Sequence, residues 1–250
     1  MPDVPLSFDA NDPLPLTGER TAPGIPEENY WFQRHVIAYD YVARLVRGAR
    51  VLDAGCGEGY GTDRLTSVAS SVTGVDLEEP VILRAAARYP RARFETANLV
   101  SLPYADASFD AVVSLQVIEH LHSPQEFLSE CARVLVPGGL LVISTPNRLT
   151  FSPDGLRNPF HTFEFAPDEL RATMAQRFSD VELLGTHHGV RVRLLEMMIR
   201  GPLTERLIRQ PVPEWPGWLR AFVEHVTPRD FVIKAAGIER SLDLMAIARR

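Results

Sequence analysis

The sequence predicts an α/β fold, with a mostly parallel sheet and helices on both of its faces. Between residues 50 and 185, short apolar runs typical of strands alternate with single segments of helical periodicity. One run, Asp110–Leu115, is apolar throughout its middle and bounded by polar residues, as expected of a strand covered on both faces. Strands that alternate with single helices form βαβ units, and such units build parallel sheets.

Each predicted element rests on a local pattern. A helical pattern begins near Tyr30, and the first strand ends in a glycine-rich loop. A later helix stops at Pro137-Gly138-Gly139, which cannot continue it. The predicted strands are residues 50–53, 71–75, 93–96, 110–115, 140–144, 179–185 and 242–248. The predicted helices are residues 30–46, 62–68, 80–88, 123–135 and 167–177.

Four segments follow from these patterns. Residues 1–29 contain six prolines and little periodicity, which predicts an extended N-terminal arm. Residues 30–189 form the predicted core. Residues 190–226 are helical but broken by prolines, and we interpret them as an insertion that covers the site or makes a dimer contact. Residues 227–250 would supply a final core helix and strand.

The composition is that of an ordinary globular protein. The chain has 250 residues, 45% of them hydrophobic and 23% charged. No apolar run approaches the roughly 18 residues that span a bilayer, and Pro2, Asp3 and Pro5 interrupt any secretory signal pattern. We therefore expect a cytoplasmic protein, either a monomer or a homodimer, with no transmembrane segment.

The charge distribution argues against nucleic acid as a partner. The net charge is −6; residues 1–189 hold 15 basic and 25 acidic side chains, and residues 190–250 hold 11 and 7. An acidic main body repels phosphate backbones. The two cysteines, Cys56 and Cys131, match no metal or disulfide pattern and are interpreted as packing residues.

Polar and glycine residues gather where the predicted strands end. In an open α/β sheet, ligands bind beyond the carboxyl ends of the strands. The segments at that edge are Asp53–Gly61, Asp76, Asn98, Leu115–His120 and Thr145–Arg148. The sequence therefore predicts one binding site along this edge.

The glycine-rich loop favours a nucleotide-type ligand without a pyrophosphate. Glycines after a strand allow close approach of a ligand, and the next helix presents free N–H groups. The G-x-G-x-x-G dinucleotide pattern fails, because Tyr60 or Thr62 stands where the third glycine belongs. No Gly-Lys-Ser/Thr follows either, so a P-loop is excluded. A carboxylate at Asp53 would repel a pyrophosphate but suits a cationic group such as an ammonium.

Asp76 adds a second contact for a nucleoside. It lies 21 residues after Gly55, at the end of the second predicted strand. An acidic side chain at that position accepts hydrogen bonds from ribose hydroxyls.

Four ordered motifs resemble those of class I S-adenosylmethionine-dependent methyltransferases of the type 11/12 group. The motifs are Val51–Gly59, Ser101–Asp110, Ile118–Leu121 and Leu135–Gly139. The resemblance covers roughly residues 30–185. It implies a Rossmann-like sheet of seven strands with the last one antiparallel. It also implies S-adenosylmethionine as cofactor and S-adenosylhomocysteine as product.

Carried over by position, the resemblance implies contacts for the methionine and ribose parts of the cofactor. Asp53, Gly55 and Gly57 would line the methionine part. Asp76 would bind the ribose, and Leu77 would flank the adenine.

The remaining implied contacts come from three further segments. Asn98 and Leu99 would meet the adenine edge, although many relatives have Asp where this chain has Asn98. Gln116 would lie beneath the cofactor after the fourth strand. Tyr30 and Arg34 resemble N-terminal helix residues that close over the methionine carboxylate, or they are plain surface-helix residues.

Two histidines are candidates for a catalytic base. Transfer of a methyl group to a hydroxyl needs a base near neutral pKa, and histidine fits. His120 follows the fourth strand at the binding edge. His161 lies in Asn158–Phe165, which resembles a segment of bacterial methyltransferases linked to saccharide and cell-envelope synthesis. Each histidine could equally be a structural group that holds a loop.

The sequence offers no metal ligands that can be named, although dependence on a metal stays open. His187 and His188 are adjacent, lack the i, i+4 spacing of helical ligands and have no carboxylate nearby in the chain.

Three functions remain open. The first is O-methylation of a sugar or polysaccharide precursor; Leu16–Arg20 and Glu27–Phe32 are also similar to segments of actinobacterial polysaccharide O-methyltransferases. The second is O-methylation of a phenolic or quinone-type ring, since the core also resembles ubiquinone-pathway methyltransferases. That acceptor would use an apolar pocket from the insertion, formed by Leu194, Leu195, Met197, Met198, Trp215 and Trp218. The third is a cofactor-binding protein without catalysis.

Overall fold

The computed structural model describes residues 21–153, 155, 158–199 and 212–250. The predicted N-terminal arm is thus described only from Thr21 onward, and the middle of the predicted insertion lies outside the described residues.

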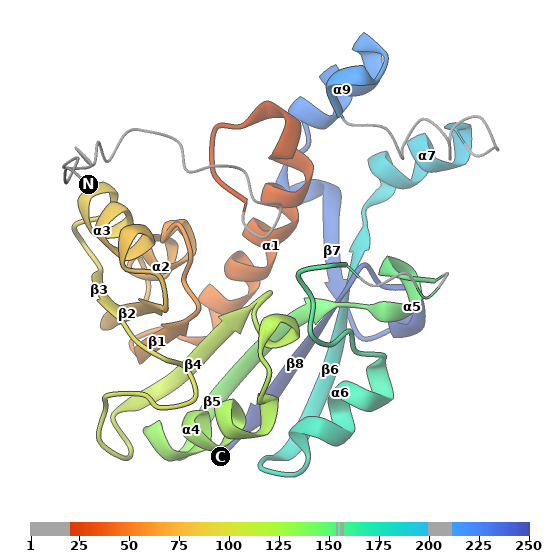
Figure 1. Cartoon of the computed structure of the whole chain (residues 1–250). Coiled ribbons are helices and arrows are strands. Elements are labelled where there is room, and N and C mark those ends of the chain that lie inside the picture. Colours follow the sequence, from red (N-terminus) through yellow and green to blue (C-terminus); the bar gives the residue numbers. More distant parts are fainter. Residues whose placement is uncertain (1–20, 154, 156–157, 200–211) are drawn as a thin grey trace, which may run out of the picture.

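Within the described residues, eight strands form one sheet in the order β3-β2-β1-β4-β5-β8-β6-β7 (Figure 1). The strands are β1 (Arg50–Ala54), β2 (Ser71–Asp76), β3 (Arg93–Thr96), β4 (Phe109–Leu115), β5 (Leu135–Pro146), β6 (Ser179–His188), β7 (Phe231–Lys234) and β8 (Asp243–Arg249). Strands β1 to β5 pair in parallel, whereas β8 is antiparallel to both β5 and β6. The carboxyl ends of the parallel strands therefore meet the start of β8 at one edge of the sheet.

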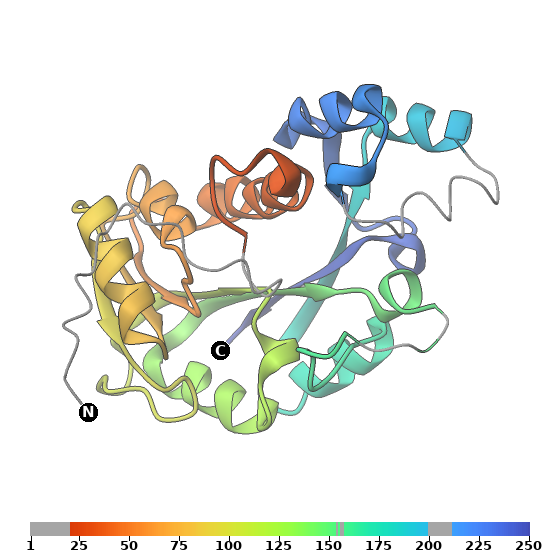
Figure 2. The same ribbon diagram turned by 45° about the horizontal axis from the view of Figure 1, so that its top comes forward.

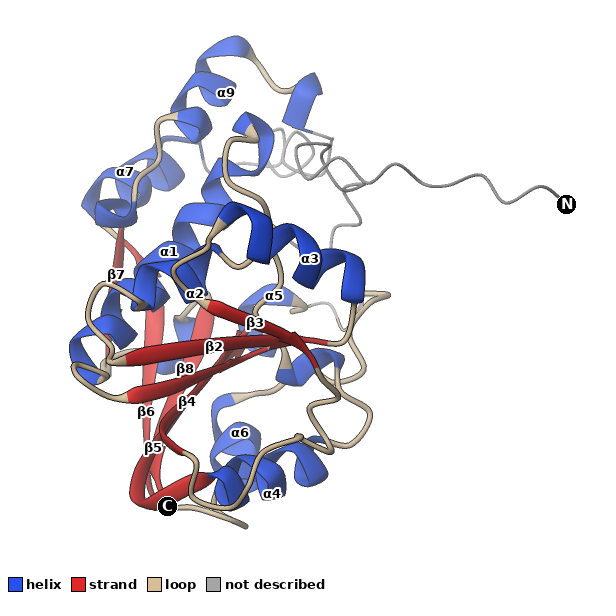
Figure 3. Ribbon diagram, turned by 90° about the vertical axis from the view of Figure 1, so that its left-hand side faces the viewer, coloured by secondary structure: helices blue, strands red, loops and turns tan. Residues whose placement is uncertain are grey.

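The helices cover the sheet on both faces. The α-helices are α1 (Asn29–Leu45), α2 (Tyr60–Leu65), α3 (Glu79–Arg88), α4 (Pro124–Val134), α5 (Arg148–Phe151), α6 (Pro167–Met174), α7 (Val190–Ile199) and α9 (Gly217–Glu224). Short 3-10 turns are η1 (Pro26–Glu28), η2 (Ile118–His120), η3 (Val212–Glu214), η4 (Pro228–Asp230) and η5 (Ile238–Arg240). Figure 3 shows α1, α2 and α3 on one face and α4 and α6 on the other.

Two apolar clusters hold these layers together. One packs α4 and α6, through side chains such as Phe127 and Leu170, against the sheet. The other packs α1 and α2, through Val42 and Leu65, against the opposite face. Burial of side chains of this size contributes about 1.5–3 kcal/mol each.

The predicted fold class is confirmed, with two differences. An eighth strand, β7, pairs with β6 at the edge, and 3-10 turns replace the final helix expected in residues 227–250. Strand β5 also begins at Leu135, directly after α4, because Leu135 pairs with Phe109 across an irregularity in the ladder. The helix has therefore already ended at Val134, and the Pro-Gly-Gly sequence expected to stop it lies inside β5.

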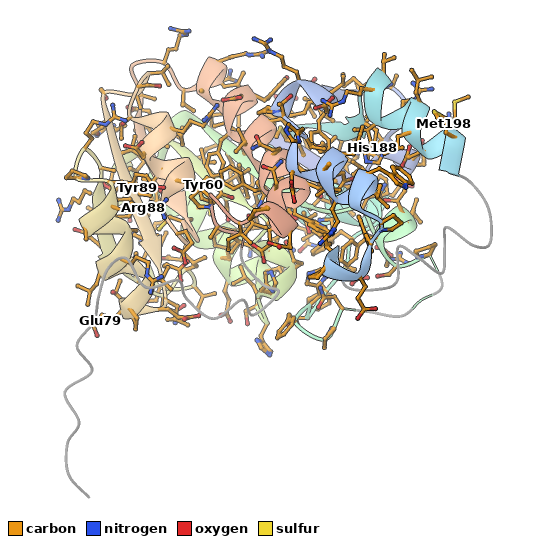
Figure 4. All side chains as sticks on the ribbon, turned by 90° about the horizontal axis from the view of Figure 1, so that it is seen from above. Tyr60, Glu79, Arg88, Tyr89, His188 and Met198 are labelled. Carbon is orange, nitrogen blue, oxygen red and sulfur yellow. The ribbon has the colours of Figure 1, made fainter. Side chains whose placement is uncertain are left out.

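The described parts of the predicted insertion divide in two. Helix α9 packs on α1, and the Asn29 amide donates hydrogen bonds to the carbonyl oxygens of Val223 and Val226, both at 2.9 Å. Helix α7 projects away from the sheet (Figures 1 and 2). Met198, 82% exposed, lies at its outer end (Figure 4). In the described part of the chain, no helix is both long and apolar enough to cross a membrane.

The glycine loop after β1 is held in place by close packing of α2 on α1. A Cβ at Gly61, in the first turn of α2, would lie 1.9 Å from the ring of Tyr39. The missing side chain is therefore what allows the two helices to approach this closely.

Replacing Gly61 by alanine should lower the free energy of unfolding by about 1–3 kcal/mol, because the added methyl group overpacks the contact with Tyr39. Gly217→Ala is the matched control, since a Cβ there meets no atom within 4 Å. Urea denaturation followed by circular dichroism measures both changes. Equal midpoints for the two variants would show that the Tyr39 ring simply moves aside.

Candidate active site

The loop between β1 and α2 folds back on the end of β2. Gly55, Gly57 and Gly59 all have positive φ angles, of 83°, 48° and 78°. The Gly55 N–H donates to the Val75 carbonyl oxygen at 2.8 Å. The Gly57 N–H donates to Asp76 Oδ2 at 3.0 Å. A Cβ at Gly57 would meet nothing within 4 Å, so the backbone there faces open space that a ligand can enter.

Asp53 lies beneath this loop and holds it. Its carboxylate is fully buried and accepts hydrogen bonds from Thr62 Oγ1 at 2.7 Å and from the Tyr39 hydroxyl at 3.2 Å. Burial raises the pKa of Asp53 to about 6, against the lowering effect of these two donors. The side chain thus ties α1 and α2 to β1. The predicted contact of Asp53 with the cofactor's ammonium group stays a prediction.

The predicted adenosine contacts lie along the next two strand ends. Asp76 Oδ1 accepts from the Glu78 N–H at 3.2 Å, which leaves further lone pairs on the carboxylate for ribose hydroxyls. Leu77 is 68% exposed, so its side chain is accessible for the predicted contact with the adenine ring. The Asn98 side chain accepts from the Val100 N–H at 3.1 Å, and Leu99 is buried in the core.

Arg34 is engaged by Asp243 at the start of β8. The guanidinium forms a buried, bidentate ion pair with Asp243 and donates to the Leu242 carbonyl oxygen at 3.1 Å. Gln116, with a positive φ of 60°, donates to Ser144 Oγ at 3.1 Å and reaches Asp243 Oδ1 at 3.5 Å. The pair of Arg34 and Asp243 therefore joins α1 to the start of β8, and Gln116 connects the end of β4 to the same carboxylate.

Tyr30 contacts the end of β6. Its hydroxyl hydrogen-bonds to His188 Nε2 at 2.5 Å, and burial raises its pKa to about 12. His188 Nδ1 pairs with Glu196 at 2.7 Å, so the folded chain supplies the nearby carboxylate that the sequence did not reveal. Both ring nitrogens of His188 are thus occupied by protein groups.

Two cavities meet at the carboxyl edge of the sheet. A small one of about 70 Å³ lies against the glycine loop, and a larger one of about 570 Å³ lies beside it. Thr21, His35 and Gln116 line both cavities, so they mark the passage between them. The larger cavity is lined by Thr21, Glu27, Glu28, Trp31, Arg34, His35, Gln116, Glu119, His120, Pro146, Phe151, Asn158, His161, Val212 and Pro213.

His35 at this junction was not identified from the sequence, because it resembles any other polar residue of a helix. Its Nδ1 lies 3.1 Å from Thr21 Oγ1 and 3.2 Å from the Tyr60 hydroxyl. Burial lowers the pKa of His35 to about 4. The imidazole is therefore neutral near pH 7 and adds no positive charge between the two cavities.

The two predicted bases lie side by side on the wall of the larger cavity. The ring centroids of His120 and His161 are 5.1 Å apart. The Glu119 carbonyl oxygen accepts from the backbone N–H groups of Thr162 at 2.7 Å and Phe163 at 3.0 Å. These two bonds fasten η2 to the loop after α5, and they bring together histidines that are distant in sequence.

Each histidine is oriented by a hydrogen bond at Nδ1. His120 Nδ1 lies 3.0 Å from the Phe160 carbonyl oxygen, and His161 Nδ1 lies 3.0 Å from Glu164 Oε1. A carbonyl or carboxylate partner requires the proton on Nδ1, so Nε2 is the basic nitrogen of each neutral ring. The same two bonds fix the directions of the rings.

Glu119 is the second residue of this site that the sequence did not identify. It lines the larger cavity and is 1% exposed, and burial raises its pKa to about 8. Thr145 lies close enough to oppose that rise slightly, but Glu119 Oε2 and Thr145 Oγ1 each lack a partner with hydrogen-bond geometry among the described residues. A glutamate inside an Ile-Glu-His motif gives no signal of such burial.

The order and directions of the strands, with a glycine loop after β1, are those of the Rossmann-like methyltransferase fold. A sequence profile for a methyltransferase domain matches residues 52–143. A probable S-adenosylmethionine-dependent methyltransferase of Mycolicibacterium smegmatis is 46% identical in an alignment of 245 positions that covers 95% of each chain. One of Mycobacterium tuberculosis is 46% identical in an alignment of 259 positions, gaps included, that covers 99% of this chain and 94% of that protein. The chain belongs to the S-adenosylmethionine-dependent methyltransferases, and S-adenosylmethionine is its cofactor.

Other matches are less similar in sequence. The ubiquinone biosynthesis O-methyltransferase of Caulobacter sp. is 34% identical in an alignment of 155 positions that covers 54% of this chain and 60% of that protein. A solved methyltransferase of Thermotoga maritima has a TM-score of 0.61 at 18% identity, covering 89% of this chain and 94% of the other. The [4+2]-cyclase SpnF has a TM-score of 0.55 at 22% identity, covering 85% and 80%. The structural likenesses show the fold only.

Asp76→Asn should weaken binding of S-adenosylhomocysteine by about tenfold or more, corresponding to about 1.4 kcal/mol. The amide has one acceptor oxygen where the carboxylate has two. The Gly57 N–H and a ribose hydroxyl can then no longer each bond to a separate oxygen. Isothermal titration calorimetry measures the change. Asp40→Asn, on the surface of α1 and paired with Arg64, is the control. Equal affinity of D76N and the unaltered chain would contradict the ribose assignment.

His35 should make the protein less stable as the pH falls. Its folded pKa of about 4 lies below the ordinary value of 6.5, so between these values the unfolded chain binds a proton that the folded chain does not. Stability is complete above pH 6.5 and is lost as the pH falls toward 4. From pH 7.5 to 5.0, His35 should account for a loss of about 1–2 kcal/mol.

Urea unfolding of the unaltered chain and of His35→Asn at both pH values tests this prediction. The substitution also removes contacts, but that cost is the same at each pH. The difference between pH 7.5 and 5.0 should therefore shrink in H35N. An identical difference in both proteins would mean that His35 keeps an ordinary pKa.

Proposed function

We propose that this methyltransferase O-methylates a hydroxyl of a sugar or polysaccharide precursor, and that the acceptor occupies the larger cavity. The observation that carries the proposal is the pair His120 and His161, oriented through Nδ1, on the wall of a cavity that adjoins the glycine-loop cavity. A methyl donor held at the loop would then face a hydroxyl held beside these two rings.

The residues of the chain would orient the reactants and remove a proton. S-adenosylmethionine supplies an electrophilic methyl group on a sulfonium. The transfer is an in-line displacement, so positioning of donor and acceptor is a large part of catalysis. We propose Nε2 of His120 as the first candidate for the base and Nε2 of His161 as the second, because Nδ1 of each ring is engaged.

The walls of the larger cavity favour a sugar acceptor. Trp31 and Phe151 contribute aromatic surface, while Asn158, Glu27 and Arg34 contribute polar groups. A sugar ring presents an apolar face and a rim of hydroxyls, and this combination of an aromatic wall with several polar groups matches both features.

The alternative is a phenolic or quinone-type acceptor. It is supported by the partial similarity to proteins named as ubiquinone biosynthesis O-methyltransferases. The described part of the insertion gives it little support, since only Val212 and Pro213 of that segment line the cavity. Leu194, Met197, Met198 and Trp218 are instead exposed.

A protein that binds the cofactor without turnover remains the third reading. The cyclase fold-relative shows that this sheet alone does not specify methyl transfer. The oriented histidine pair inside the cavity argues for catalysis, because a mere binding protein has no use for two basic nitrogens at that place.

An acceptor screen with S-adenosylmethionine labelled in its methyl group tests the proposal. Oligosaccharides and sugar precursors should accept label, and simple phenols should accept far less. His120→Ala or His161→Ala should lower kcat by about 10²- to 10⁴-fold, as expected for loss of a general base. S-adenosylhomocysteine affinity should be unchanged in both variants.

His122→Ala is the matched control, because His122 is exposed and only two positions from His120. Label on phenols alone would favour the alternative acceptor. Full activity of both H120A and H161A would eliminate the base assignment. Tight cofactor binding with no turnover on any acceptor would support the non-catalytic reading.

A further inference from the structure

We propose that Glu119, His120 and His161 bind a divalent first-row transition-metal ion, and that the hydroxyl of the acceptor coordinates this ion. The second clause rests on the proposed function, whereas the first does not.

The three side chains meet although they come from different parts of the chain. One ligand atom from each lies within 4.8 Å of the other two. Bonds of about 2.0–2.2 Å to one ion would bring these atoms roughly 1–2 Å closer together. The sequence alone does not predict this site, because η2 and the loop after α5 are distant in the chain and are joined by hydrogen bonds that form in the folded structure, from Thr162 and Phe163 to the Glu119 carbonyl oxygen and between His120 and the Phe160 carbonyl oxygen.

The buried carboxylate of Glu119 indicates a ligand independently of this clustering. The side chain is 1% exposed, and Oε2 has no hydrogen-bond partner among the described residues. Leaving a buried carboxylate oxygen without a partner is costly, and such a group normally pairs or coordinates a metal. Because Glu119 lines the cavity, an ion there would satisfy it.

The hydrogen bonds at Nδ1 are those of metal-binding histidines. A metal-ligating histidine usually donates its other ring N–H to a carbonyl or a carboxylate, and this bond fixes the ring toward the metal. His120 meets the Phe160 carbonyl oxygen and His161 meets Glu164, both through Nδ1. We therefore assign Nε2 of each ring as the ligand atom.

The charges and the ligand types in the wall of the larger cavity indicate which ion would bind. Glu27 and Glu28 also line the cavity, while the charge of Arg34 is matched by its ion pair with Asp243. The surroundings therefore favour a cation. Two imidazoles with one carboxylate suit zinc, iron, nickel or cobalt better than magnesium, which prefers oxygen ligands.

A bound ion would take over the task otherwise given to a histidine base. Coordination lowers the pKa of the hydroxyl, so its proton passes to water in the cavity. The oxygen then forms a bond to the methyl carbon, and the carbon–sulfur bond breaks with its electron pair on sulfur. The products are a methyl ether, S-adenosylhomocysteine and the released proton. No oxidant or reductant is needed.

Calorimetric titration of the full chain with Zn²⁺, after chelation and removal of any histidine tag, tests the site. We expect one ion per chain. His120→Ala and His161→Ala should weaken Zn²⁺ binding at least tenfold, and His122→Ala should leave it unchanged. Glu119→Gln keeps the shape of the side chain and should also weaken binding. Binding of S-adenosylhomocysteine by each variant verifies that it is folded.

Absence of stoichiometric Zn²⁺ binding would overturn the proposal, as would equal affinity for the unaltered chain, H120A and H161A. The Zn²⁺ titration needs no methyl acceptor. It therefore tests the metal site even if no acceptor is found. With an active acceptor, chelation should abolish turnover and Zn²⁺, Mn²⁺ or Co²⁺ should restore it. Full turnover by the chelated enzyme would overturn the catalytic clause while leaving the proposed methylation intact.

Discussion

The buried ion pair between Arg34 and Asp243 is the interaction on which the site depends. It joins α1, which covers one face of the sheet, to the first residue of β8. Gln116, at the end of β4, reaches the same carboxylate and marks the passage between the two cavities. Removing one partner of such a pair leaves an uncompensated buried charge, which typically costs about 3–5 kcal/mol. The loss would loosen α1, the start of β8 and the region between the two cavities together.

The reversed direction of β8 makes this arrangement possible. In a purely parallel sheet, every strand would bring its carboxyl end to the binding edge. Because β8 runs antiparallel to β5, it begins at that edge, and Asp243 pairs across from Pro146. The start of β8 thus supplies an acid at the same edge of the sheet at which Gln116 and the η2 turn follow β4. Loops alone would hold such an acid less firmly than a strand paired on both sides.

How much the sequence predicts depends on whether a feature is local. The strand and helix alternation, the glycine loop and the position of Asp76 are encoded within a few residues, and the structure agrees on the fold class. Strand β7 is only four residues long and is stabilised by pairing with the edge of β6. Its local sequence is too short to predict a strand. The direction of Asp53 depends on Tyr39 and Thr62, which lie on two different helices. Likewise, His120 and His161 were identified singly, but their pairing depends on backbone bonds between η2 and a distant loop.

The electrostatics of the two cavities fit a reaction that consumes a cation. A sulfonium loses its positive charge as the methyl group leaves, so a site that held it too strongly would stabilise the reactant over the transition state. His35, kept neutral by burial, adds no charge at the passage. Acidic groups line the larger cavity instead: Glu119, whose Oε2 has no hydrogen-bond partner among the described residues, together with Glu27 and Glu28. In the proposed reaction these acidic groups would balance a cation bound beside the acceptor hydroxyl, where negative charge develops as the proton leaves.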